Sequence, residues 1–279
     1  MRRLVGSTLA FVCLAAPLAA QQQDYAANMH RAHMGDAPVA SPASAAVHGA
    51  EALEGEVVTY GTVNGRALKG YLVKAAGGKQ GPAVIVVHEW WGINDNIKQM
   101  TRNLAAAGYT ALAVDLFDGK VATTPDAALK LYQGAMAAVP AGEANLGAAV
   151  KYLKGWGATS IGSIGWCFGG HWSLRTGLVG GADVQAVAMY YGAPITDVKE
   201  LGRLKAPVLG LFGGKDGGIP VAAVREMQAA AKGLKKSFDV QVYENADHAF
   251  ANPSGNAYDK TAADDAMART LAFFKVNLK

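Results

Sequence analysis

Short apolar segments alternate with helical segments over most of the chain, and this alternation limits the fold more than any other feature. PAVIVVHE (82–89) is an apolar run typical of a buried strand, and INDNIKQMTRNLAAAG (93–108) is a helical segment that ends at a glycine. Such alternation predicts βαβ units, and therefore a largely parallel sheet with helices on both faces. Further strands are expected at 109–116, 159–166, 184–192, 206–214 and 238–244, and further helices at 125–139, 142–155, 168–179, 220–235 and 261–277.

A β-hairpin is expected in front of this sheet. The segment EVVTYGTVNGRALKGYLVKA, which begins at Glu56, has two β-rich runs around Asn64-Gly65. Both of these positions tolerate a positive φ, which a tight hairpin turn requires. With 51% hydrophobic and 17% charged residues among 279, the chain has the composition of a globular protein. We therefore expect one α/β domain over residues 56–279.

The first 55 residues are expected to lie outside this domain. MRRLVGSTLAFVCLAAPLAA has a charged start, an apolar stretch and small residues near Ala20, which predicts a secretory signal peptide over 1–20. The apolar stretch is too short to span a bilayer, which needs roughly 20 residues. Residues 21–55 are rich in Ala, Pro, Ser and Gln, so we expect a flexible arm. These features predict a periplasmic or secreted protein without stable membrane association after removal of the signal.

The charge of the chain disfavours a nucleic-acid partner. The formal net charge is +4, and Arg2 and Arg3 in the signal account for two of these charges. No run of Lys or Arg could follow a phosphate backbone. We expect a monomer that acts on a small molecule.

Cys167 lies in the sequence GSIGWCFGGHWS, between a predicted strand and a predicted helix. Once the signal and its Cys13 are removed, it is the only cysteine, which excludes an intramolecular disulfide. A strand-to-helix turn flanked by Gly165, Gly169 and Gly170 is typical of a nucleophile elbow, where neighbouring backbone leaves no room for a β-carbon. The helix N-terminus would favour the thiolate. Alternatively, Cys167 is a small buried hydrophobic residue.

Two further residues favour the catalytic interpretation. Asp216 and His248 each follow a predicted strand, so both are expected at the carboxyl edge of the sheet. The order nucleophile, acid, histidine is that of the α/β-hydrolase fold, which we predict here. In such a triad, His248 accepts the proton of Cys167, and Asp216 orients the imidazole. Taken singly, Asp216 could cap the next helix and His248 could be an ordinary loop histidine.

The segment HEWWG, at the end of the first apolar strand, adds Glu89 and Trp90 to the predicted site. The backbone amides of Trp90 and Phe168 are the expected oxyanion-hole donors. A carboxylate beside Cys167 opposes the thiolate, so we expect Glu89 to keep the resting thiol protonated and less readily oxidised. The alternative is that Glu89 pairs with a base at the surface.

Four blocks of the chain, VIVVHEWWGINDNIKQMTRNLAAAGYTALAVDLFDG, SIGWCFGG, GGKDGGIP and ADHAF, resemble the dienelactone hydrolase family of α/β hydrolases in order and spacing. The resemblance covers the chain from about Glu56 to its end. It implies Cys167 as nucleophile, His248 as base, Asp216 as orienting acid and Glu89 as the residue that the resting thiol contacts. It also implies hydrolysis of small esters or lactones without a metal or an organic cofactor.

The chain departs from this family where the dienelactone-specific enzymes place arginines for the substrate carboxylate. Those places read Asp118-Gly119-Lys120 and Ala251-Asn252 here. Lys120 would supply a point charge in place of a bidentate fork. We expect Lys120, Asn252 and Trp91 to line the substrate site. The tryptophans near the motifs form either an aromatic wall for neutral groups or ordinary packing: they are Trp90, Trp91, Trp166 and Trp172.

Two other classes of function stay open at this point. One is a binding protein that keeps the hydrolase fold, for which the cluster Met29-His30-Arg31-Ala32-His33-Met34 offers thioether and imidazole ligands to copper. A tether with incidental residues is the alternative for that cluster. The other class is a redox-active Cys167, which would need an external resolving thiol.

Overall fold

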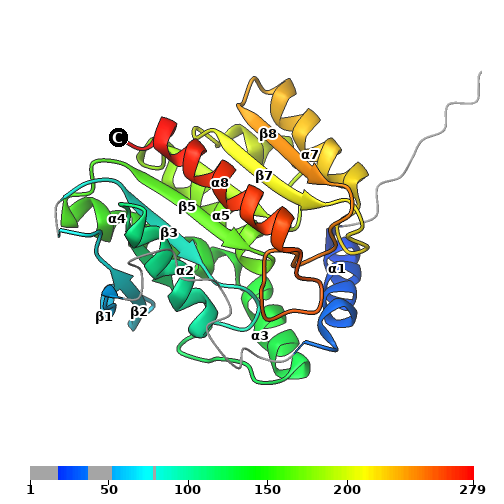
Figure 1. Cartoon of the computed structure of the whole chain (residues 1–279), viewed down its shortest axis with the longest axis horizontal. Coiled ribbons are helices and arrows are strands. Elements are labelled where there is room, and N and C mark those ends of the chain that lie inside the picture. The colour runs from blue at the N-terminus through cyan, green and yellow to red at the C-terminus, as the bar shows by residue number, and fades with distance from the viewer. Residues whose placement is uncertain (1–17, 37–51, 78–79) are drawn as a thin grey trace, which may run out of the picture.

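An eight-stranded sheet forms the centre of the computed structural model, which describes residues 18–36, 52–77 and 80–279 (Figure 1). Its strands run in the order β1-β2-β4-β3-β5-β6-β7-β8 within the described residues. Their bounds are β1 Glu56–Val63, β2 Arg66–Val73, β3 Ala83–Val87, β4 Thr110–Val114, β5 Ile161–Trp166, β6 Ala186–Tyr190, β7 Val208–Gly213 and β8 Phe238–Tyr243.

The direction of the strands agrees with the sequence pattern. β1 and β2 form the predicted antiparallel hairpin, and its turn residues Asn64 and Gly65 have φ values of 51° and 76°. β2 also pairs antiparallel with β4, whereas the remaining neighbours pair in parallel. Every residue of β3, β4 and β6 is buried, as expected for strands covered on both faces. The predicted α/β-hydrolase fold is confirmed.

Helices cover both faces of the sheet. α2 (Asp95–Ala106) and α8 (Lys260–Asn277) cross one face, in front of the strands in Figure 1, and α4 (Val139–Trp156) and α5 (Phe168–Gly180) lie behind it. The short α6 (Val198–Gly202) was not predicted, because five residues are too few to show a helical period. Further helices among the described residues are α3 Pro125–Ala137, α7 Val221–Gly233 and the 3-10 turn η2 Gly181–Asp183.

The N-terminal segment differs from the expected flexible arm. Leu18–His33 forms a helix, α1, drawn in blue in Figure 1. Tyr25, Met29 and His33 are buried, and their spacing of four residues places them on one face of α1. On another side of α1, Nε2 of His30 bonds to the Asp126 carboxylate of α3 at 2.8 Å. Residues 1–17 of the predicted signal and 37–51 of the predicted arm lie outside the described residues.

None of the helices in the described part of the chain combines the length and the apolar character that crossing a membrane requires.

A buried histidine on α5 illustrates how the helix layer is fixed. His171 accepts a hydrogen bond on Nε2 from Nε of Arg175 at 2.9 Å and donates from Nδ1 to the Ala193 carbonyl at 3.0 Å. This pattern requires the neutral imidazole with its proton on Nδ1. Burial and the positive charge of Arg175 lower the pKa of His171 to about 4. Arg175 itself pairs with Glu143 at 2.8 Å.

His171 is expected to make the protein less stable in acid. The unfolded chain binds a proton at the ordinary histidine pKa of about 6.5, whereas the folded chain does not bind it until about pH 4. The contribution of His171 is therefore complete above pH 6.5 and falls by up to about 3 kcal/mol as the pH drops toward 4. Urea unfolding at pH 7 and pH 4.5 measures this loss. The variant His171→Gln cannot titrate and should lose less stability; equal losses in the two proteins would contradict the assignment.

Candidate active site

The predicted elbow is present between β5 and α5. Cys167 has φ 58° and ψ −120°, a left-handed conformation that a non-glycine residue rarely adopts. A β-carbon on Gly165 would lie 2.1 Å from the Gly169 carbonyl oxygen, and one on Gly169 would lie 2.2 Å from the Val87 carbonyl oxygen. The chain therefore needs glycine on both sides of the cysteine. Cys167 stands where β5 ends and α5 begins, and only 1% of it is exposed.

The structure brings Asp216 and His248 together at the same edge of the sheet. Nδ1 of His248 bonds to Oδ2 of Asp216 at 2.7 Å. The other oxygen of Asp216 accepts hydrogen bonds from the amides of Gly218 and Ile219, both at 2.9 Å. One carboxylate thus orients the imidazole and also fixes the loop before α7. With its Nδ1 bonded to the carboxylate, His248 is left with Nε2 as the nitrogen available to Cys167.

The charges around Cys167 favour a thiolate. Burial raises the pKa of Cys167, but its interactions with His248 and His33 outweigh burial and lower that pKa to about 6. Burial lowers the pKa of His248, whereas Asp216 and Cys167 raise it, to about 10. The arrangement thus favours a thiolate beside an imidazolium at neutral pH. This differs from the expected protonated resting thiol, because His33 adds a second basic group that the sequence interpretation did not place there.

Glu89 lies beside the cysteine and is 2% exposed. Burial raises its pKa to about 7, and the charge of Cys167 acts in the same direction. Its Oε2 accepts a hydrogen bond from Nδ2 of Asn252 at 3.0 Å. The partner of Glu89 is therefore a buried amide and not a surface base. Asn252, which we expected to contact substrate, instead holds Glu89 in this structure.

His88 fixes the backbone next to Glu89, a position to which sequence reasoning assigned no role. Its Nδ1 bonds to the Glu89 carbonyl at 2.6 Å, and its Nε2 accepts from the Leu116 amide at 3.1 Å. Burial lowers the pKa of His88. A neutral His88 thereby joins the end of β3 to the loop that follows β4.

We expect Glu89→Gln to remove one ionisation from the pH profile of the reactivity of Cys167. With a pKa of about 7, Glu89 is largely protonated at pH 5.5, where glutamine resembles it, and is charged near pH 8, where its carboxylate opposes the neighbouring thiolate. Rates of alkylation by iodoacetamide and of oxidation by peroxide, followed from pH 5 to pH 9 in EDTA-containing buffer, should change near pH 6 and pH 7 in the parent and only near pH 6 in Glu89→Gln. Glu244→Gln, at an exposed position, is the matched control. Equal rates in parent and Glu89→Gln would refute the influence of Glu89 on the thiol.

The four tryptophans separate into two pairs. The rings of Trp90 and Trp91 lie 4.8 Å and 6.4 Å from the His33 ring, so both border the site. Trp166 packs on Tyr190 at 5.4 Å, and Trp172 packs on Phe168 at 5.9 Å. An aromatic wall is therefore available only from the first pair, and the second pair forms ordinary core packing.

Lys120 lies in the loop that follows β4. It is exposed and borders a pocket of about 610 Å³ between the hairpin, the loop after β4 and the helices α3 and α4. The described lining of this pocket includes none of Cys167, Asp216 and His248. The predicted oxyanion donors do lie at the site by position, because Phe168 is the first residue of α5 and Trp90 follows Glu89. Their role stays a prediction.

His33 is the site residue that sequence reasoning missed. Its Nδ1 bonds to Oδ2 of Asp36 at 2.5 Å, and its ring centre lies 5.5 Å from that of His248. The sequence groups His33 with neighbouring Met and His residues as possible copper ligands. Within that group, His30 bonds to Asp126, Met29 is buried and Met34 is 65% exposed, so the side chains do not converge. The sequence did contain one indication of this position: Tyr25, Met29 and His33 are spaced four residues apart, which places them on one face of a helix.

Comparison with known proteins identifies the family. The model of the "Dienelactone hydrolase family" matches residues 68–278. The chain belongs to the dienelactone hydrolase family. A relative from Methylorubrum extorquens named "Putative carboxymethylenebutenolidase" is 32% identical over 254 residues, which are 85% of this chain and 86% of the relative. Protein usf of Aquifex pyrophilus is 34% identical over 225 residues, covering 76% of this chain and 94% of the relative.

Solved structures agree with this assignment. A Klebsiella pneumoniae structure titled "Putative Dienelactone Hydrolase" aligns with a TM-score of 0.72 and 25% identity, covering 80% of this chain and 98% of that chain. The family and these relatives identify the protein as a hydrolase.

Proposed function

We propose that this member of the dienelactone hydrolase family hydrolyses small carboxylic esters or lactones, with Cys167 as the nucleophile. One observation carries the proposal: a cysteine with a pKa lowered to about 6 sits in a strained elbow, next to a histidine that Asp216 orients at 2.7 Å. This is the arrangement that nucleophilic catalysis by cysteine requires, since the thiolate is the attacking species.

The proposed reaction has two halves. Cys167, whose proton His248 already holds, attacks the substrate carbonyl as the thiolate. The amides of Trp90 and Phe168 stabilise the oxyanion that forms. His248 then gives its proton to the leaving oxygen, which departs and leaves a thioester on Cys167. Water, deprotonated by the same histidine, attacks the thioester and releases the acid. Asp216 stabilises the imidazolium in both halves.

We propose a neutral, apolar acyl group for the substrate. Trp90 and Trp91 border the site, as does the Tyr191 ring at 5.1 Å from that of His248, and Lys120 is exposed in a pocket whose described lining does not include the cysteine. The places where dienelactone-specific enzymes carry arginines hold no arginine here, so the chain offers a carboxylate substrate no bidentate partner there. We further propose that the N-terminal pattern directs export of the protein, as its charged start and short apolar stretch support.

Substrate entry requires α1 to move. Cys167, Glu89 and His248 are 1%, 2% and 3% exposed, and a buried face of α1 with Tyr25, Met29 and His33 lies over them. A carbonyl carbon needs to approach the sulfur to about 3 to 3.5 Å before bond formation. The described arrangement is therefore a closed form, and turnover belongs to a form in which α1 has withdrawn.

Intact-mass spectrometry tests the proposal. The protein is mixed with short activated esters and with enol lactones, and both product release and the mass of the protein are followed. We expect a transient acyl adduct on Cys167, and the added mass identifies the acyl group that the protein prefers. Absence of both adduct and product, while the thiol still reacts with iodoacetamide, would contradict hydrolysis by Cys167.

A further inference from the structure

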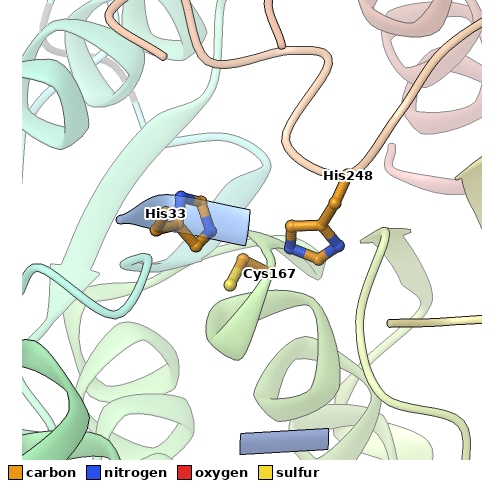
Figure 2. A group of neighbouring side chains, drawn as sticks. All are labelled: His33, Cys167 and His248. Carbon is orange, nitrogen blue, oxygen red and sulfur yellow. The ribbon is translucent and has the colours of Figure 1, made fainter. Parts of the chain in front are cut away.

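Three potential ligand atoms meet at the closed site. One ring nitrogen each of His33 and His248 and the sulfur of Cys167 lie within 4.8 Å of one another. The three residues come from α1, from the elbow before α5 and from the loop after β8, and Figure 2 shows the cysteine between the two imidazoles. His33 and His248 are 2% and 3% exposed, so water does not surround this cluster.

Each histidine is held by a carboxylate in the same manner. Nδ1 of His33 bonds to Asp36 at 2.5 Å, and Nδ1 of His248 bonds to Asp216 at 2.7 Å. The Nε2 atoms of both rings are buried, and both rings interact with the sulfur of Cys167. Metal-binding histidines commonly carry such a carboxylate on the second nitrogen, because it orients the ring and makes the ligating nitrogen more basic.

The hydrolysis proposed above needs only one of these two pairs. Cysteine catalysis uses a single base, His248, and gives no function to a second buried carboxylate–histidine pair. In the described structure one sulfur serves as the partner of two basic nitrogens. An ion that binds both nitrogens and the thiolate at once would give each ring a ligand bond of its own.

We propose that His33, Cys167 and His248 bind a divalent transition-metal ion, with Zn²⁺ as the preferred ion. Two imidazoles and a thiolate are ligands for borderline-soft metals and not for Mg²⁺ or Ca²⁺. Zinc bonds of about 2.0 to 2.3 Å place tetrahedral ligand atoms roughly 3.5 Å apart. Small side-chain rotations reach that spacing from the present separations. Cys167 binds as the thiolate and both histidines bind as neutral imidazoles, so the protons on the ligating ring nitrogens pass to solvent, and the fourth position is left to water.

The metal would join α1 to the elbow. Because Zn²⁺ occupies both the sulfur and Nε2 of His248, the bound form has neither a free nucleophile nor a free base. This consequence rests on the proposed function, whereas metal binding itself does not. The ion would therefore stabilise the closed form and stop hydrolysis, and removal of the ion would restore it.

Metal titration of the full-length protein tests the inference. The protein is freed of metal with EDTA and titrated with Zn²⁺, and with Co²⁺ as a coloured substitute; bound metal is counted after desalting. We expect one ion per chain, a thiolate-to-cobalt charge-transfer band, and affinity at least 100-fold weaker in His33→Ala. Asp36→Asn should weaken binding by about 10- to 100-fold. Ala27→Gln, at an exposed position on the same helix, is the matched control, because it leaves the cluster and the contacts that hold α1 unchanged.

Two results would overturn the inference. One is that the parent protein takes up no stoichiometric metal. The other is that His33→Ala and Cys167→Ser both bind metal with the same affinity as the parent protein. Circular dichroism of each variant shows that loss of metal is not loss of folding. Ester hydrolysis by the metal-free protein separates the two proposals. If the metal-free protein hydrolyses esters and Zn²⁺ neither binds nor inhibits it, the hydrolase proposal is supported and the metal site is refuted. If the metal-free protein is inactive but gives the cobalt charge-transfer band, the metal site is supported and hydrolysis by Cys167 is refuted.

Discussion

Cys167→Ala is expected to lower kcat/KM for p-nitrophenyl acetate by about 10⁴-fold, because the proposed acyl intermediate forms on its sulfur. The change removes one sulfur atom from a buried turn. Alanine, like cysteine, is a non-glycine residue that has to adopt the φ of 58°, so we expect the variant to fold like the parent. Steady-state hydrolysis in EDTA-containing buffer measures the loss, and circular dichroism checks the fold.

His248→Ala supplies the internal control for this prediction. If cysteine and histidine act as one unit, each single variant loses about as much activity as the double variant. Losses that add, or an activity above one tenth of the parent in either single variant, would show that the described pair does not perform the reaction.

The sheet was predictable because its strands are buried on both faces. AVIVV in β3 and TALAV in β4 are continuous apolar runs, and the following polar or glycine residues mark where each strand ends. The predicted strand over 82–89 was longer than β3, which ends at Val87. His88 and Glu89 extend the run in the sequence, but their side chains bond outside the ladder. The pattern of apolar residues in the sequence indicates which residues are buried. Because residues beyond the end of β3 are buried as well, the pattern does not locate the end of the strand.

The candidate site was predictable only where backbone chemistry demands particular residues. Gly165 and Gly169 are required by carbonyl oxygens closer than 2.5 Å to any added β-carbon, so the elbow is visible in the sequence. Asp216 and His248 follow from their places after β7 and β8. The partner of Asn252 could not be foreseen, because its bond to Glu89 joins loops 163 residues apart. Long-range pairs between irregular segments have no period to detect.

The position of α1 was missed for a different reason. Its segment is rich in polar residues, and among the residues of α1 whose burial is described the buried ones are Tyr25, Ala26, Met29 and His33. So few apolar residues give a weak sequence signal, yet they are enough to dock a helix that other contacts also hold. Here those contacts are His30 with Asp126, and Asp36 with the Asn256 amide at 3.1 Å.

Met29→Glu is expected to release α1 and to expose the active site. Met29 is 2% exposed, and a carboxylate placed there would lose several kcal/mol of hydration without a designed partner. If the open form makes up about 1% of the parent protein, full release raises the apparent reaction rate of Cys167 by up to about 100-fold. We expect at least a 10-fold faster alkylation by iodoacetamide in EDTA-containing buffer, with a parallel rise of kcat/KM for a short ester.

Ala27→Glu is the matched control, because it adds the same charge to the same helix at an exposed position. Its alkylation rate should stay within about two-fold of the parent, since a solvated charge on α1 does not disturb docking. Cooperative urea unfolding of Met29→Glu would show that the sheet and the elbow remain folded while α1 is displaced. If Met29→Glu reacted no faster than Ala27→Glu, α1 would not limit access to Cys167. Substrate would then have to reach the thiol by a route that leaves the helix in place.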